Sequence, residues 1–157
     1  MILHIIRHGK TNQESPTGKD FDRELLEKGV KQSELLGNYL KASSDCVVYC
    51  SSAKRTMQTF EIANKSWGLK HINVLEDLYL CSRDHLLQLI FSQEQHPEIM
   101  IVGHNFGISD LASYFLEEGI ELRTGEYLAL EFDIDTWQEA SRGLATIRDR
   151  YRPRVAL

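Results

Sequence analysis

The sequence predicts a three-layer α/β/α sandwich built on a mostly parallel central sheet. Short apolar runs alternate along the chain with segments in which apolar residues recur at helical spacing. Strands that alternate with helices are typical of a parallel sheet whose two faces are covered by helices. The length of 157 residues and the 42% share of hydrophobic residues suit one core. We therefore expect a single domain over residues 1–157.

The first half of the chain contains three expected strands and two expected helices. A polar loop over residues 7–25, with Pro16 and Gly18, separates the first strand from the first helix, and Gly68 ends the second helix. The strands are expected at residues 2–6, 46–50 and 71–75, and the helices at residues 26–41 and 56–67.

The second half adds two helices and three strands. Asn105 stands where a helix N-cap belongs, because it follows an apolar strand and precedes an apolar helical face. A turn is expected around residues 133–143, between two strands of alternating pattern. The helices are expected around residues 86–90 and 108–115, and the strands at residues 99–102, 127–132 and 144–151.

The net charge and the N-terminal residues limit the partners that we expect. A net charge of -5 gives no overall basic field for nucleic acid or anionic lipid, so any anion site has to be local. The apolar stretch at residues 1–6 is too short for a signal peptide or a membrane span. We expect a cytoplasmic protein with neither a nucleic-acid partner nor a membrane partner.

The three cysteines and six histidines predict neither disulfides nor a metal site. Three cysteines are too few, and of the wrong parity, for a disulfide framework. Cys46 and Cys50 fall in the expected second strand as core thiols, while the place of Cys81 stays open. None of the histidines or cysteines falls in a paired ligand spacing typical of zinc, so we expect no metal and no cofactor.

Polar residues that suit phosphate chemistry follow four of the expected strands. The guanidinium fork of arginine matches phosphate, and an imidazole beside a flexible glycine can approach a phosphate closely. Sheets of this class bind ligands at the carboxyl ends of their strands, so four separated segments should meet at one rim. These segments are Arg7-His8-Gly9, Ser51 to Arg55, Glu76-Asp77 and Gly103-His104.

Three motifs at this rim together resemble the histidine phosphatase, or phosphoglycerate mutase-like, superfamily. They are Arg7-His8-Gly9-Lys10-Thr11, Ser51 to Thr59, and Val102-Gly103-His104-Asn105. The resemblance covers essentially the whole chain in the right order, and it implies the phosphoglycerate mutase-like fold. The compact length, the segment Asp22-Arg23-Glu24-Leu25 and the loop at Leu78-Tyr79 look most like the SixA-type phosphohistidine phosphatases of this superfamily.

The resemblance implies a role for each of five residues. His8 is the expected nucleophile, and Arg7 and Arg55 are expected to bind phosphoryl oxygens. His104 is expected to complete the pocket, and Arg23 is similar to a further phosphate-contacting arginine of the SixA-type branch. Bidentate arginines fit phosphate, and clustered cations should keep the His8 ring neutral, with a lone pair for attack. The same cations stabilise the charge of the transition state, so no metal is expected there.

Two positions depart from the superfamily pattern, and the proton donor is open between two carboxylates. Leu26 stands where a hydroxyl residue often follows Arg-x-Leu, so the first helix lacks its usual cap. Phe106 replaces a proline that often follows Gly-His-Asn. The superfamily places its general acid after the third strand, where we favour Asp77 over Glu76 because Asp77 directly precedes Leu78-Tyr79.

The remaining histidines and the C-terminal arginines are interpreted as structural or solvated. The histidines lie within a strand pattern or in polar stretches, at His4, His71, His85 and His96. Arginines on one face of the last strand favour a solvated edge that blocks sheet-to-sheet pairing over a docking patch for an acidic partner. These arginines are Arg148, Arg150, Arg152 and Arg154.

The preferred function is a phosphatase that works through a phosphohistidine intermediate on His8. Its expected substrate is a phosphohistidine in a protein, such as a histidine phosphotransfer domain, because the loops at residues 10–22 and 78–84 are too short for a substantial lid. The alternatives are a small-molecule phosphomonoesterase or mutase on the same core, and a non-catalytic phosphate-binding module. The last is disfavoured because His8, Arg7, Arg55 and His104 are all present.

Overall fold

The structure is a computed structural model that describes residues 1–94 and 96–156. In this part of the chain, six strands and four α-helices follow one another in the predicted order. The strands are β1 (Ile2–Arg7), β2 (Val47–Ser51), β3 (His71–Leu75), β4 (Glu98–Gly103), β5 (Tyr127–Glu131) and β6 (Thr146–Tyr151). The α-helices are α1 (Glu27–Tyr39), α2 (Lys54–Trp67), α3 (Arg83–Phe91) and α4 (Gly107–Leu116).

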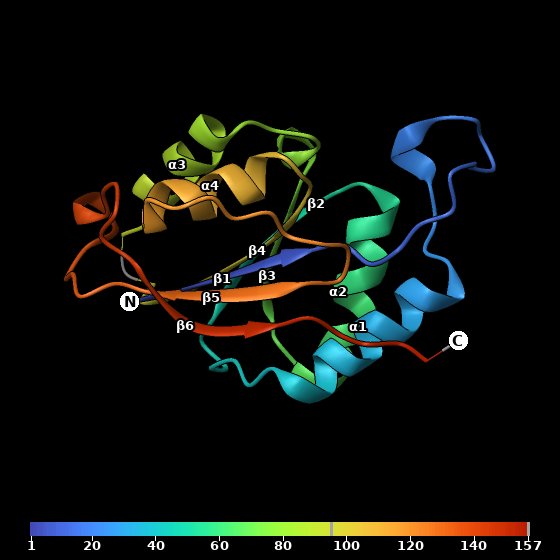
Figure 1. Cartoon of the computed structure of the whole chain (residues 1–157), viewed down its shortest axis with the longest axis horizontal. Helices are drawn as coiled ribbons and strands as arrows, with labels where there is room; N and C mark the ends of the chain where they lie inside the picture. The colour runs from blue at the N-terminus through green and yellow to red at the C-terminus, as the bar shows by residue number, and fades with distance from the viewer. Residues whose placement is uncertain (95, 157) are drawn as a thin grey trace.

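The strands form one mixed sheet in the order β3-β2-β4-β1-β5-β6. The strands β1 to β4 are parallel to one another, whereas β5 is antiparallel to β1 and β6 is antiparallel to β5. Figure 1 shows α3 and α4 on one face of the sheet and α1 and α2 on the other. The prediction of a three-layer fold with a mostly parallel sheet is therefore confirmed.

Each face of the sheet has its own apolar core. Consecutive strand residues point to opposite faces, so Ile5 packs in the cluster that contains Phe115 of α4, while Ile6 packs in the cluster that contains Leu36 of α1 and Phe60 of α2. These five side chains are at most 3% exposed. Burial on both faces fixes the direction of β1 and thereby the place where its carboxyl end leaves the sheet.

Most predicted boundaries lie within about three residues of those in the structure. Gly68 ends α2 in the left-handed conformation, with φ 66° and ψ 29°, as predicted. The prediction of Asn105 as the N-cap of α4 is wrong, because Phe106 takes that position and the Asn105 side chain bonds Ser109 and the Leu122 carbonyl instead. In the described residues no helix is long and apolar enough to cross a membrane.

Three short 3₁₀ helices occupy segments that the pattern treated as loops. They are η1 (Asp20–Asp22), η2 (Glu76–Leu78) and η3 (Trp137–Glu139). Single turns of this kind have no hydrophobic period, so pattern analysis does not find them. Two of them matter for the site, because η1 and η2 contain carboxylates close to its rim.

The arginines of the C-terminal edge do more than solvate it. β6 is an edge strand, as predicted. However, the carboxylate of Glu126 is fully buried and accepts hydrogen bonds from Arg150 Nε at 2.7 Å and Arg152 Nε at 2.9 Å. A buried carboxylate needs such partners, so two of the arginines neutralise a buried charge. Arg148 pairs with the exposed Glu131 and fits the solvated-edge interpretation.

Candidate active site

A cavity of about 330 Å³ lies at the carboxyl ends of β1 and β4 and beside the first turn of α2. The fold brings together there five of the six predicted site residues, from four separated segments. The five that line the cavity are Arg7, His8, Arg23, Arg55 and His104. The sixth, Asp77, is discussed below.

The ring of His8 is held in one tautomer. His8 is 7% exposed, and its Nδ1 lies 2.8 Å from the carbonyl oxygen of Gly9. A carbonyl only accepts hydrogen bonds, so Nδ1 carries the hydrogen and Nε2 carries the lone pair. Burial first, and then the cations Arg55 and Arg7, lower the pKa of His8 to about 4. We expected the cations to be the main cause of neutrality, but desolvation contributes most.

Gly9 is required by a close backbone approach rather than by flexibility. A Cβ atom at Gly9 would lie 2.7 Å from the carbonyl oxygen of Gly29, and one at Gly29 would lie 2.2 Å from that of Lys10. Because neither contact is sterically allowed, larger residues would push the loop after β1 away from α1. The two glycines therefore set the position of the backbone that carries His8.

Three nitrogen atoms around this cavity have no hydrogen-bond partner. The structure contains six buried side-chain N or O atoms without a partner among the described residues, and half of them are Arg7 Nε, Arg55 Nε and His104 Nδ1. Buried polar groups in proteins are nearly always paired, so unpaired ones call for a ligand or water. The three residues that carry these atoms all line one cavity, which fits an acceptor-rich ligand such as an oxyanion.

The ring of His104 is oriented by Ser51, the last residue of β2. His104 Nε2 lies 2.8 Å from Ser51 Oγ, and Ser51 Oγ accepts a hydrogen bond from the Ala53 backbone N–H. The serine hydroxyl hydrogen can therefore be donated to Nε2, in which case Nδ1 carries the ring hydrogen and is the nitrogen without a partner. Burial, followed by His8 and Arg55, lowers the pKa of His104 to about 3, so the ring is neutral near pH 7. Sequence reasoning assigned no role to Ser51.

Asp20 on η1 connects the arginines of the site, and sequence reasoning missed it. Its carboxylate accepts hydrogen bonds from Arg55 at 2.9 Å, from Arg23 at 3.0 Å and from the hydroxyl of Tyr79. The Tyr79 bond first, and then the two arginines, hold the pKa of Asp20 well below its usual range. Asp20 is therefore ionised at neutral pH. The feature of the sequence that could have identified Asp20 is its position three residues before Arg23, which allows an ion pair.

Arg23 is already engaged in the free protein. Besides Asp20, its guanidinium donates to the Thr11 hydroxyl at 2.6 Å and to the Asn12 carbonyl at 2.7 Å. These bonds use three of the five guanidinium N–H groups, so a phosphoryl group can accept from Arg23 without displacing an acceptor. The similarity that made it a phosphate-binding candidate remains a prediction.

The structure does not bring Asp77 or Glu76 into the cavity. Both lie on η2, neither lines the cavity, and the Asp77 carboxylate pairs with His85 Nε2 at 3.2 Å. The side chain of Asp77 is 64% exposed. His85, expected to be solvated, thus has a charged neighbour. The assignment of Asp77 as the general acid remains a prediction, and it requires a movement of this side chain.

The lowered pKa of His8 predicts that acid destabilises the protein. Between about pH 6.5 and pH 4 an unfolded His8 binds a proton that the folded one excludes, so the free energy of unfolding falls as the pH falls. The contribution of His8 is on the order of 3 kcal/mol across this window. Urea denaturation at successive pH values should show a flatter profile for His8→Gln than for the wild type.

The control for this measurement is His71→Gln, because His71 is exposed on the edge strand β3. It should leave the slope of stability against pH unchanged. Equal slopes for the wild type and His8→Gln would contradict the buried, neutral state of His8.

A comparison with protein-family models finds a match in the N-terminal part of the chain. Residues 3–79 match the histidine phosphatase superfamily (branch 1). The matched stretch contains Arg7, His8, Arg23 and Arg55, while His104 lies beyond it. A search of curated proteins finds no match to the sequence.

Solved structures with a similar fold cover nearly the whole chain. A SixA from Nakamurella multipartitia, described as a candidate phosphohistidine phosphatase, superposes with a TM-score of 0.82 at 20% identity, over 97% of this chain and 95% of that one. A similarly described SixA from Agrobacterium tumefaciens gives 0.80 at 21% identity, over 97% of each chain. The protein histidine phosphatase SixA complexed with tungstate gives 0.78 at 19%, over 96% of each chain. These likenesses confirm the expected fold.

Proposed function

We propose that this chain, whose residues 3–79 match the histidine phosphatase superfamily (branch 1), is a member of that superfamily, acts through a phosphohistidine intermediate on His8 and needs no metal. The observation that carries the proposal is the set of unpaired nitrogen atoms of Arg7, Arg55 and His104 around the cavity that His8 lines. A phosphoryl group offers oxygens that can accept from all three. Fixed cationic donors supply the charge stabilisation that Mg²⁺ provides elsewhere.

The proposed first step is an in-line displacement at phosphorus. Nε2 of His8 forms a bond to phosphorus while the bond from phosphorus to the leaving group breaks. The donors of Arg7, Arg55 and His104 stabilise the charge on the equatorial oxygens. Positive charge develops on the His8 ring, and the Nδ1–H bond to the Gly9 carbonyl stabilises it. Water then attacks phosphorus, which releases phosphate and restores neutral His8.

The positions and protonation states of the carboxylates near the cavity favour a substrate that needs no strong proton donor. Among the lining residues in the described chain, Asp20 is the one carboxylate, and it is ionised. Asp77 is turned to His85 at the surface. An alkyl phosphate needs a proton on its leaving oxygen, whereas a phosphohistidine with a protonated ring leaves as neutral imidazole. These facts support a phosphoramidate substrate.

The surroundings of the cavity support a protein as the carrier of that phosphohistidine. Leu80, which lines the cavity, is 54% exposed, and Phe106, next to the lining residue Asn105, is 70% exposed. Exposed apolar side chains beside a polar cavity are typical of surfaces that contact another protein. We therefore propose a phosphorylated protein domain as the substrate.

The test compares kcat/KM on a phosphorylated histidine phosphotransfer domain with that on a panel of small phosphomonoesters. We expect the protein substrate to be preferred. We also expect Asp77→Ala to reduce cleavage of alkyl phosphates much more than cleavage of phosphohistidine, because only the former needs a donated proton. Asp84→Ala, which removes an exposed carboxylate nearby on α3, is the matched control.

A different outcome would assign the protein to small-molecule chemistry. A preference of tenfold or more for one metabolite, equal to about 1.4 kcal/mol of transition-state binding, would overturn the proposed substrate class. Equal loss of both activities in Asp77→Ala would contradict the argument from the leaving group.

A further inference from the structure

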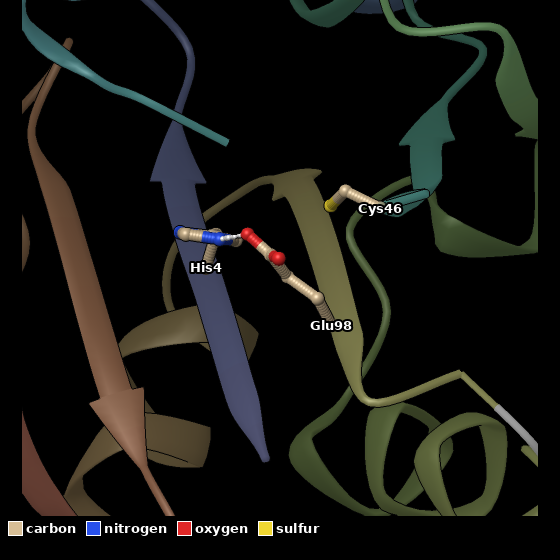
Figure 2. A group of neighbouring side chains, drawn as sticks. All are labelled: His4, Cys46 and Glu98. Carbon is tan, nitrogen blue, oxygen red and sulfur yellow. Dashed lines mark hydrogen bonds and ion pairs between the residues drawn. The ribbon is translucent and has the colours of Figure 1, made fainter. Parts of the chain in front are cut away.

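A second group of chemically active side chains lies near the amino ends of the central strands, away from the phosphate cavity. His4 comes from β1, Glu98 is the first residue of β4, and Cys46 directly precedes β2. The potential ligand atoms of these three residues all lie within 4.8 Å of one another. Figure 2 shows the His4 ring and the Glu98 carboxylate pointing at each other, with the Cys46 sulfur directed toward them.

We infer that His4, Cys46 and Glu98 form a zinc-binding site that ties together β1, β4 and the start of β2. One imidazole nitrogen, one sulfur and one carboxylate oxygen match the mixed ligand preference of Zn²⁺, whereas Mg²⁺ and Ca²⁺ prefer oxygen ligands alone. Thiolate, carboxylate and neutral imidazole together balance the double charge of the ion. The ligands come from three separate segments of the chain, which is why no paired spacing appears in the sequence.

The hydrogen bonds of His4 allow its proton to move when a metal binds. Nε2 lies 2.6 Å from Glu98 Oε1, and Nδ1 lies 2.7 Å from the hydroxyl of Tyr127. A hydroxyl both donates and accepts, so Tyr127 can reverse its role when the ring hydrogen passes from Nε2 to Nδ1. Nε2 is then free to bind zinc, and the Tyr127 bond fixes the orientation of the ring.

Of the three proposed ligands, the thiol of Cys46 has the weakest hydrogen bond within the protein. The Cys46 sulfur lies 4.0 Å from the carbonyl oxygen of the adjacent Val47, which is a long hydrogen bond. The side chain of Cys46 is fully buried, and without a metal its thiol carries a proton. Zinc binding has to displace this proton, and the balanced step releases one H⁺ for each ion bound.

The metal has a route to the site and room for a further ligand. A cavity of about 400 Å³, lined by His4 and Glu98 together with Tyr39 and Ser43, opens beside the group. Zinc–ligand bonds of about 2.0 to 2.3 Å place neighbouring ligands roughly 3.5 Å apart, so the His4–Glu98 contact has to widen by about 1 Å. A water molecule from the cavity can complete the tetrahedron.

The test is a titration of the metal-free protein with Co²⁺, which replaces zinc and reports its ligands by absorption. We expect one equivalent to bind with a thiolate-to-cobalt charge-transfer band, and Zn²⁺ to displace it. Cys46→Ser should abolish that band and weaken binding by about 100-fold or more, and His4→Gln should do the same. His8→Ala and Cys81→Ser should both keep the band, which separates this site from the phosphate cavity and from the partly exposed thiol of Cys81.

Two measurements on the wild type do not depend on how the variants fold. X-ray absorption of the zinc-loaded protein should show one sulfur neighbour at about 2.3 Å, and binding should release one proton. A cobalt spectrum without sulfur charge transfer, a band that survives Cys46→Ser, or binding that His8→Ala abolishes would each overturn the inference.

Discussion

Replacement of His8 by alanine is expected to lower turnover by several orders of magnitude, as removal of a covalent nucleophile does in other enzymes. The Gly9 carbonyl holds the ring in the tautomer whose Nε2 lone pair is free, and burial keeps the ring neutral. Among the lining residues of the described chain, the other histidine is His104. Its Nε2 is already bonded to the Ser51 hydroxyl, so it is not a comparable nucleophile. The measurement is kcat on a phosphorylated protein and on a small phosphomonoester.

The same variant should also lose the covalent intermediate. Wild-type protein quenched during turnover should contain a phosphoryl adduct that is acid-labile and base-stable, and mass spectrometry should place it on the peptide that contains His8. His104→Ala should slow the reaction but still form the adduct, since it removes a donor rather than the nucleophile. Near-normal turnover in His8→Ala, or an adduct on another residue, would refute the mechanism.

The fold was predictable because its signals are local. The central strands are mostly apolar runs, as in β4, and the helices have an apolar face, as in α4. These patterns determine which surfaces are buried, and burial on both faces requires a layered arrangement. The rule that ligands bind at the carboxyl ends of parallel strands then brought Arg7, His8 and His104 together without any knowledge of the sheet order.

The remaining parts of the site depend on contacts between distant segments. Asp20 meets Arg55 across 35 positions of sequence, and Ser51 meets His104 across 53. No spacing rule finds such pairs. Asp77 is the opposite case. Its position after the third strand predicted a place in the cavity, but it lies on a single turn of 3₁₀ helix and its carboxylate pairs with His85. The helix cap at Asn105 failed for a similar reason, because Ser109 and Leu122 compete for its side chain.

The second large effect is expected for Arg55→Ala, which should weaken tungstate or vanadate binding and lower kcat/KM by about 100-fold to 1000-fold. This is the range found when one preorganised donor is removed from a transition-state site. Arg55 is 3% exposed, its Nε is unpaired, and its other nitrogens are held by Asp20. The side chain is therefore fixed before the ligand arrives, and its loss removes both a charge and an oriented donor.

Three further measurements separate the role of Arg55 in phosphate binding from a role in folding. Arg55→Lys keeps the charge but not the planar fork, so it should recover only part of the activity. Asp20→Asn leaves Arg55 in place with a weaker anchor, and should lower oxyanion affinity less than Arg55→Ala does. Arg142→Ala, at an exposed position, is the control for a general loss of positive charge.

Wild-type turnover should persist in EDTA, because side-chain cations hold the phosphoryl group. If Mg²⁺ restored activity to Arg55→Ala or to a chelated wild type, the stabilising charge would belong to a metal, and the argument from the three unpaired nitrogens would fail.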